Sequence, residues 1–361
     1  MIELFDVGTD NKIKKSFLSK TNQLIDNKDF ILGQDVHVFE KKVSEFLNSR
    51  YSVGVNSGTD ALELALRCAG VTKNSKVIVP GFSFFATSEV IYKLGAEPVF
   101  CDISKKDLCI DIEDVQENFS NKIKAVIPVH LFGNFAEIKN ISKLKKEFDF
   151  KIIEDVAQAF GSSLNDKKAG TIGDFGAFSF YPTKNLGAIG DAGLITTNTS
   201  KNNNVLRMLR NHGQKERYKH EFVGYNSRLD SIQAIILNEK LKSIDKSINK
   251  RILNSQRYLI NFTSNDKIIS HAQDNQPMNI FPVSFDGMKT KERVKKVLRE
   301  NRVSFGEYYP IGLNNLPMVK GNQRVLKNVN WATQNILSLP CHPNITFKQI
   351  DFITDTICTA L

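Results

Sequence analysis

Cysteine is scarce and scattered in this chain of 361 residues. The cysteines are odd in number and none forms a C-x-x-C pair; they are Cys68, Cys101, Cys109, Cys341 and Cys358. A disulfide framework needs an even set, and a structural zinc site needs closely spaced ligands. The sequence therefore predicts buried or incidental thiols and no metal site.

Long hydrophobic runs are also missing. No stretch approaches the roughly 20 apolar residues that a membrane helix requires. The N-terminus from Met1 to Asp6 lacks the basic stretch followed by an apolar run that marks a secretory signal. We therefore expect a cytoplasmic protein with no membrane partner.

Acidic residues are outnumbered, and the formal net charge is +10. Clustered Lys and Arg can bind nucleic acid. Most lysines here are scattered along helical stretches, which favours a solvated surface and no nucleic-acid partner. The exception is the segment from Arg210 to His220, where basic side chains crowd beside Tyr218. A loop of this composition could hold a diphosphate.

Short β-rich apolar runs alternate with helical patterns through about the first 240 residues. This alternation is typical of an α/β fold, a mostly parallel sheet with helices on both faces. We expect helices at 59–69 and 83–94. Strands are predicted at 51–55, 76–79, 97–101, 124–129, 151–154, 177–180 and 194–197.

The last third of the chain has a different pattern. A helical pattern from Arg228 to about Tyr258 predicts one long connector between domains. Beyond it, strands and helices are predicted at 280–285, 289–301, 304–309 and 347–361. We expect a large domain over residues 1–240 and a small α+β domain over 241–361, with residues 1–30 packing on the small domain.

Three segments follow predicted strands, where ligands bind in such sheets. The first, Asn56 to Leu62, contains Gly58, Thr59 and Asp60 at a helix start, where free N–H groups attract a phosphate. A plain N-cap by Ser57 or Thr59 explains the same residues at least as well.

The second segment is Ile152 to Gln158, in which an apolar strand delivers two acids and a glutamine at its carboxyl end. A carboxylate there can keep the ring nitrogen of pyridoxal phosphate protonated, and Asp155 is our candidate. The alternatives are a metal ligand or a helix cap.

The third segment is Phe178 to Gly187, where Lys184 follows a strand and precedes a glycine-rich turn. A lysine amine can form a Schiff base with the cofactor aldehyde and then move protons. Most lysines are solvated surface residues, so the position of Lys184 and its neighbours carries this interpretation.

Together these segments make the chain resemble the sugar-nucleotide aminotransferases of the DegT/StrS type, over nearly all of its length. The resemblance rests on residues 31–33, 58–62, 80–84, 154–158, 179–187, 190–193 and 224–230. It implies a fold-type I transferase with a seven-stranded sheet that binds pyridoxal 5'-phosphate and passes through pyridoxamine 5'-phosphate.

The resemblance also implies residue roles. Lys184 bonds the cofactor and Asp155 contacts its ring nitrogen, while the phosphate is held by Gly58, Thr59, Asp60 and Ser179. Gln158 is expected near the ring hydroxyl, Phe84 on the ring face, and Asn226 from a second subunit of a homodimer with shared active sites. Without the resemblance, Phe84 is a core residue and Asn226 a turn residue.

The substrate side resembles members that aminate C3 of a nucleotide-linked keto sugar. We expect Arg228, Tyr309 and His342 to bind this substrate, with Arg228 pairing with a uronate carboxylate through its fork. Two departures are Tyr308, where close members have His, and Ala192, where the family commonly has Gly.

The resemblance names L-glutamate as amino donor and a nucleotide-diphosphate keto sugar as acceptor, in surface polysaccharide biosynthesis. One alternative is a pyridoxal-phosphate sugar dehydratase, in which relatives replace the lysine by histidine. Another is a cofactor-binding regulatory protein. A nucleic-acid binder, suggested only by charge, is the third.

Overall fold

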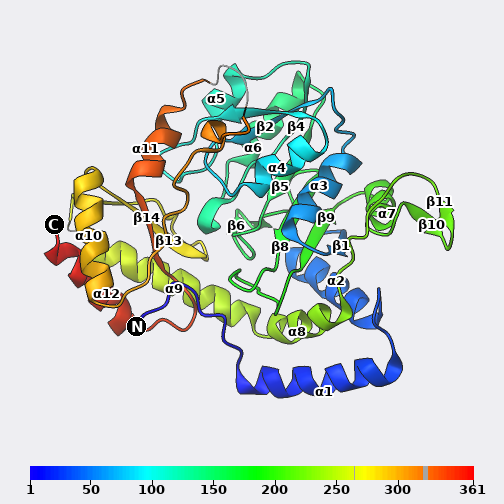
Figure 1. Cartoon of the computed structure of the whole chain (residues 1–361), viewed down its shortest axis with the longest axis horizontal. Coiled ribbons are helices and arrows are strands. Elements are labelled where there is room, and N and C mark those ends of the chain that lie inside the picture. Colours follow the sequence, from blue (N-terminus) through cyan, green and yellow to red (C-terminus); the bar gives the residue numbers. More distant parts are fainter. Residues whose placement is uncertain (264, 320–323) are drawn as a thin grey trace.

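A seven-stranded sheet forms the centre of the chain in the computed structural model, which describes residues 1–263, 265–319 and 324–361 (Figure 1). Its strand order is β1-β9-β8-β5-β4-β2-β3. Within the described residues, β9 alone runs opposite in direction to the other six strands. The strands are β1 (Tyr51–Val55), β2 (Lys76–Pro80), β3 (Glu97–Cys101), β4 (Ile123–Val126), β5 (Lys151–Asp155), β8 (Phe175–Ser179) and β9 (Gly193–Thr197). The expected α/β fold is confirmed.

Both faces of this sheet are covered, which explains why its strands are almost uniformly apolar. Successive side chains of a strand point to opposite faces. Val77 and Val79 accordingly join one buried cluster, which includes residues of α3 (Gly58–Cys68) and α4 (Ala86–Lys93). Ile78 joins a second cluster, with residues of α2 (Gln34–Leu47) and α8 (Ser231–Leu241).

Further helices surround this centre. Helix α1 (Asn11–Asn27) lies along α8 at the bottom of Figure 1. The others are α5 (Ile112–Glu117), α6 (Ile138–Lys143), α7 (Ser200–Leu209) and the 3-10 turns η1 (Leu131–Gly133) and η2 (Leu144–Lys146). A short hairpin of β6 (Ser163–Leu164) and β7 (Lys167–Lys168) connects β5 to β8.

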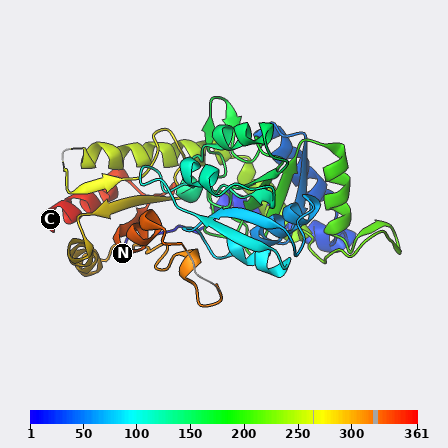
Figure 2. The ribbon, with the colours of Figure 1, turned by 90° about the horizontal axis from the view of Figure 1, so that it is seen from above.

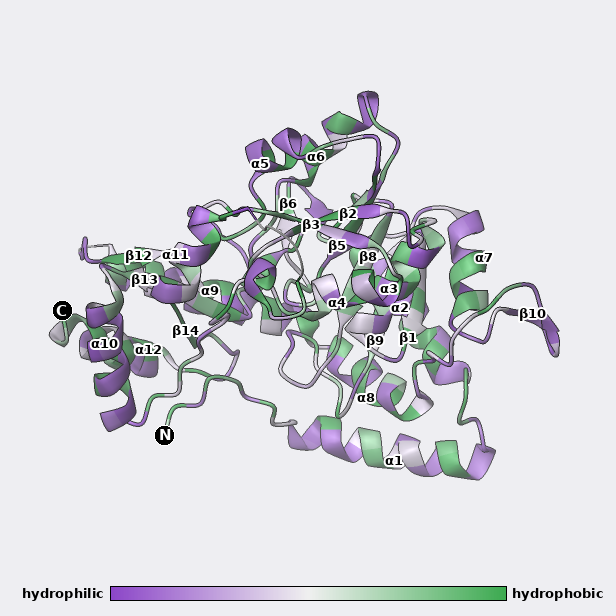
Figure 3. Cartoon of the chain, turned by 45° about the horizontal axis from the view of Figure 1, so that its top comes forward, coloured by the Kyte–Doolittle hydropathy of each residue, from purple (hydrophilic) through white to green (hydrophobic). Residues whose placement is uncertain are grey.

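A second, smaller sheet lies at one end of the molecule, where Figure 2 also shows both termini. Its antiparallel order is β12-β13-β14, with β12 (Ile268–Ser270), β13 (Ile280–Phe285) and β14 (Ile336–Pro340). The elements around it are α9 (Ile244–Phe262), α10 (Met288–Glu300), η3 (Leu313–Asn315), α11 (Lys327–Asn335) and α12 (Phe347–Thr359). In Figure 3, α10 is mostly hydrophilic, as expected for a helix with one buried stripe.

Two predicted elements are wrong. The long connector is two helices, because α8 ends before Lys242 and the backbone of Ser243 leaves the helical region (φ −119°, ψ 17°). The strand predicted at 304–309 is an irregular segment with a bridge from Gly306 to Ser338. Its apolar and aromatic residues line a cavity or pack against the hydrophobic core, and they do not extend the hydrogen-bonded pairing of the described sheet.

The N-terminal residues up to Asn27 contact both the region of the small sheet and that of the seven-stranded sheet. Ile2 bridges to Val303 beside the small sheet, while α1 packs on α8 of the large one. The division at residue 240 stays a prediction. Within the described residues, no helix is both long and apolar enough to cross a membrane.

Candidate active site

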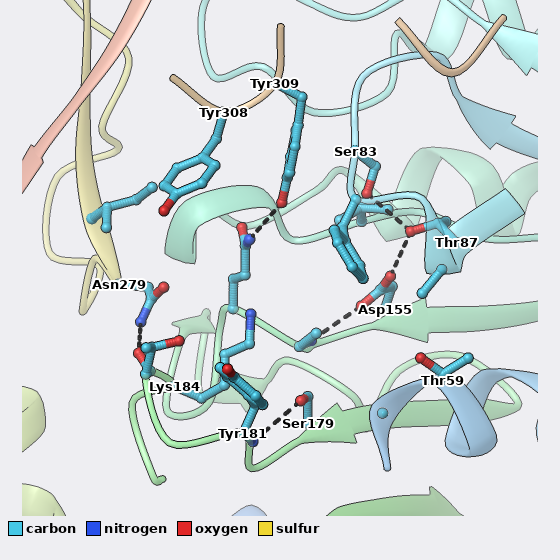
Figure 4. A pocket seen from close by; sticks show the side chains of 18 of the residues that line it. Thr59, Ser83, Thr87, Asp155, Ser179, Tyr181, Lys184, Asn279, Tyr308 and Tyr309 are labelled. Atoms are coloured by element: carbon cyan, nitrogen blue, oxygen red, sulfur yellow. Dashed lines mark hydrogen bonds between the residues drawn. The ribbon is translucent and has the colours of Figure 1, made fainter. Parts of the chain in front are cut away.

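The carboxyl ends of the parallel strands open into a cavity of about 920 Å³. Segments following β1, β2, β5 and β8 line it on one side, and residues 279–280 and 307–310 line it on the other (Figure 4). The predicted site residues that it brings together are Gly58, Thr59, Phe84, Asp155, Gln158, Ser179, Lys184 and Tyr309.

Lys184 lies in the loop after β8, and its side chain extends into the cavity (Figure 4). Its backbone N–H donates to the carbonyl of Tyr181 at 2.9 Å, which closes a turn. Burial lowers the pKa of the Lys184 ammonium, and the negative charge of Asp155 opposes that shift. A lysine in such a place gives up its proton more readily than a surface lysine, as an amine nucleophile must.

Asp155 ends β5 and is held by two donors. Its Oδ1 accepts from the N–H of Ala157 at 3.1 Å, and its Oδ2 from the hydroxyl of Thr87 at 3.0 Å. The Ser83 hydroxyl lies 2.9 Å from that of Thr87. Because an ionised carboxylate only accepts hydrogen bonds, the Thr87 hydroxyl donates to Asp155 and accepts from the Ser83 hydroxyl. Burial raises the pKa of Asp155, and the bonds from Ala157 and Thr87 oppose the rise.

Glu154, the other acid of the motif, points to the opposite face of the strand and has a structural place. It is fully buried and accepts from the backbone N–H groups of Gly170, Ile172 and Gly173 at 2.9, 2.7 and 2.6 Å. His130 Nδ1 accepts from an amide, so its Nε2 donates to Glu154 at 3.0 Å. Glu154 therefore organises a turn, and of these two acids Asp155 is the one that faces the cavity.

Gln158 joins the two sides of the cavity. Its Nε2 donates to the Tyr309 hydroxyl at 3.0 Å, and its Oε1 accepts from the N–H of Phe132 at 2.8 Å. Burial raises the pKa of Tyr309, so its hydroxyl stays protonated. Phe84, which is 58% exposed, also lies near Tyr309, with ring centroids 6.3 Å apart.

The start of α3 offers an anion site at the cavity wall. Ser57 caps the helix by accepting from the N–H of Asp60 at 3.1 Å. In the described part of the chain, no hydrogen bond takes up the N–H groups of Gly58 and Thr59. A Cβ on Gly58 would come within 2.6 Å of Ser179 Cβ, so only glycine lets the two walls approach this closely.

Four predicted residues are not part of the cavity lining, among the residues that the structure describes. Asp60 accepts from Ser227 at 2.6 Å, and Arg228 donates to Asn211 at 2.9 Å. Asn226 pairs through its backbone with Asn211 and is exposed. His342 is buried just after the end of β14. The functional roles given to these four residues stay predictions.

The cavity also has residues to which no role was assigned from the motifs. Ser83 and Thr87 follow β2, Phe5 comes from the N-terminal segment, Asn279 precedes β13, and Glu307 follows the bridge at Gly306. The hydroxyl spacing of Ser83 and Thr87, four residues apart before and within a helix, is a signal that could have been found. Phe5, Asn279 and Glu307 reach the cavity only through tertiary packing.

Comparison with known proteins places this architecture. The family model described as the DegT/DnrJ/EryC1/StrS aminotransferase family matches residues 11–358. The chain belongs to this family. It is therefore a pyridoxal-phosphate-dependent transaminase, and the suspected resemblance is confirmed.

Three curated relatives share about a third of its residues. A UDP-N-acetyl-3-dehydro-alpha-D-glucosamine 3-aminotransferase of Acidithiobacillus ferrooxidans is 33% identical, over 96% of this chain and 94% of that protein. A UDP-2-acetamido-2-deoxy-3-oxo-D-glucuronate aminotransferase of Pseudomonas aeruginosa is 32% identical, over 100% and 99%. A protein of Geobacillus stearothermophilus named a pleiotropic regulatory protein is also 32% identical, over 96% and 94%.

Solved structures agree with the fold. DesV of S. venezuelae, in complex with a ketimine intermediate, superimposes with a TM-score of 0.94 at 28% identity, covering 99% of this chain and 97% of that one. A Bacillus subtilis protein solved with bound pyridoxamine phosphate gives 0.93 at 26%, covering 99% and 85%. These likenesses confirm fold and cofactor class.

The residues present fit pyridoxal phosphate. Lys184 and Asp155 face one cavity, and the N–H groups of Gly58 and Thr59, for which the described residues supply no acceptor, are donors for a phosphate beside the Ser179 hydroxyl. When bound, the cofactor supplies an electron sink for amino-group chemistry.

Proposed function

We propose that this enzyme transfers the amino group of L-glutamate to C3 of a nucleotide-linked keto sugar. UDP-2-acetamido-3-keto-glucuronate is the leading acceptor and a dTDP-3-keto-6-deoxyhexose the second. The product would serve surface polysaccharide biosynthesis, such as lipopolysaccharide O-antigen. The names of the relatives from A. ferrooxidans and P. aeruginosa support the acceptor class.

One observation carries the proposal: Lys184 and Asp155 face the same cavity from adjacent strands, with space beside them. About 920 Å³ is near the upper end of ordinary small-molecule sites, so it accommodates more than a cofactor ring. A histidine in place of the lysine marks the dehydrating relatives, and this chain has Lys184.

The protein side chains divide the work. The Lys184 amine, its pKa lowered by burial, would hold the cofactor through its aldehyde and would serve as the proton carrier at the reacting carbon. Asp155, oriented by Thr87 and Ala157, would keep the ring nitrogen protonated. Gln158, hydrogen-bonded to Tyr309, would lie on the ring hydroxyl side, and the start of α3 would bind the phosphate.

The proposal includes a homodimer with shared sites. Asn226 and Arg228 follow a hairpin of β10 (Gln214–Glu216) and β11 (Lys219–His220), which projects from the right edge of Figure 1. Phe84 and Tyr181 are half exposed although they line the cavity. A second copy that covers these side chains and contributes Asn226 and Arg228 would complete the site.

Mixing the holoenzyme with glutamate tests the amino donor. We expect the visible absorbance of lysine-bound cofactor to fade and one equivalent of 2-oxoglutarate to appear. A coloured protein that is indifferent to glutamate would contradict the aminotransferase role and favour a dehydratase or a regulatory protein. A protein that cannot take up the cofactor would overturn the site itself.

A further inference from the structure

The loop that carries Lys184 is fastened to the other side of the cavity by one side chain. Asn279 lies just before β13 and is 2% exposed. Its Nδ2 donates to the carbonyl oxygen of Thr183 at 3.0 Å and to Oδ1 of Asn185 at 3.1 Å. These are the residues on either side of Lys184, as Figure 4 shows for the first bond.

The reverse contact strengthens the same junction. Asn185 donates from Nδ2 to the carbonyl of Pro277 at 2.9 Å. Residues 277–279 and 183–185 are thus joined by three hydrogen bonds, all of them buried or nearly so. Because a buried amide is costly to leave unpaired, this arrangement tolerates little displacement of the loop.

The backbone of Asn279 is itself held independently of its side chain. Its N–H donates to the carbonyl of Phe132 at 2.7 Å, and its carbonyl accepts from the guanidinium of Arg251 at 3.1 Å. Arg251 is buried and also binds the carbonyls of Met278 and Cys341, at 3.1 and 3.2 Å. A substitution of the Asn279 side chain therefore leaves its backbone anchored.

We propose that Asn279 is a positioning residue that holds the Lys184 amine in its buried place facing Asp155. The inference rests on the proposed role of Lys184 as the reactive amine, but on no choice of sugar or donor. Asn279 acts through the two neighbours of Lys184 and needs no contact with the substrate. It makes the geometry of the reactive lysine depend on the docking of the small sheet.

The chain offers a matched control in the same segment. Gln276 is 5% exposed and exchanges two hydrogen bonds with the backbone of Ser163, at 3.1 and 2.8 Å. Gln276→Ala therefore removes as many bonds between this segment and the large domain as Asn279→Ala, but none beside Lys184. A purely structural role predicts equal effects of the two substitutions.

The test is the reactivity of Lys184 in the protein freed of cofactor. Pyridoxal, which lacks the phosphate, is added over a pH series, trapped with borohydride, and the Lys184 peptide is quantified by mass spectrometry. Since burial lowers the pKa of Lys184, release of the loop should raise it toward the ordinary value. We expect the labelling midpoint of Asn279→Ala to move up by about one pH unit and neutral-pH labelling to slow about tenfold.

The Gln276→Ala protein should melt at a similarly reduced temperature but keep the wild-type midpoint. Equal midpoints in wild type and Asn279→Ala, or equal shifts in both variants, would overturn the positioning role alone. If Asn279→Ala does not fold, Asn279→Asp, which keeps the shape but loses the amide N–H, is compared in the same way. A wild-type protein whose Lys184 resists labelling would instead refute its role as the reactive amine.

Discussion

The floor of the cavity and its rim are built differently. Asp155 and Gln158 on the floor each have two hydrogen-bond partners within the chain, and Lys184 lies in a loop tied down on both sides. On the rim, Phe84 and Tyr181 line the cavity but are 58% and 50% exposed. The contrast teaches that the residues proposed for the amino-group chemistry are ordered by contacts within one chain, whereas the rim is left open for the second copy that we propose.

The floor is most sharply tested at Lys184. Lys184→Ala should lower turnover at least about a thousandfold, because both the bond to the cofactor and the proton carrier are lost. Release of 2-oxoglutarate from glutamate measures this. Lys201→Ala, an exposed lysine of α7, should keep wild-type activity. Retained turnover without Lys184 would refute the assignment.

Asp155 should come next in size. Asp155→Asn removes the charge opposite the ring nitrogen and should cost on the order of a hundredfold in the glutamate half-reaction. Asp166→Asn is a suitable control, because Asp166 is exposed and its positive φ of 62° suits asparagine equally well. Equal rates in the two variants would remove Asp155 from the site.

Arg228, which we propose a second copy contributes at the rim, should respond differently. Arg228→Ala is expected to raise KM for the keto sugar about tenfold and to leave the glutamate half-reaction unchanged, because a carboxylate partner is lost only in the second half. Steady-state kinetics with each substrate separates the two effects. A slower glutamate half-reaction would mean that Arg228 also supports the floor, which would blur the distinction between floor and rim.

The smallest expected effect is a pH shift from Thr87. Burial already raises the pKa of Asp155, so the folded protein binds a proton at this carboxylate more readily than the unfolded chain does. The protein therefore loses stability as pH rises from the ordinary pKa of an aspartate to the raised pKa of the folded state. Thr87→Val removes a hydrogen bond that opposes this rise, so the pKa of Asp155 should rise further. The acid limb of the pH profile should move to higher pH, with activity reduced a few fold at neutral pH. Thr87→Ser, which retains the donor, should restore the wild-type profile.

The motifs at strand ends predicted most of the residues on the cavity floor, because side chains along a β-strand alternate regularly between the two faces of the sheet. The same regularity separates Glu154 from Asp155, although composition alone treats them as a pair of acids. Asn279 could not be predicted, since it meets the Lys184 loop only through the docking of the small sheet. The segment 304–309 has the composition of a strand, yet within the described residues it makes only one bridge, at Gly306. Residues 307–309 then line the cavity and do not pair with any strand that the structure describes.

The fate of the glutamate nitrogen tests the central claim most directly. The enzyme is given ¹⁵N-glutamate and a UDP-linked 3-keto sugar, and the product is analysed by mass spectrometry and NMR. We predict one ¹⁵N on C3 of the sugar, absent with Lys184→Ala. A sugar that has lost water without gaining ¹⁵N, or one left unchanged while glutamate is consumed, would contradict the account.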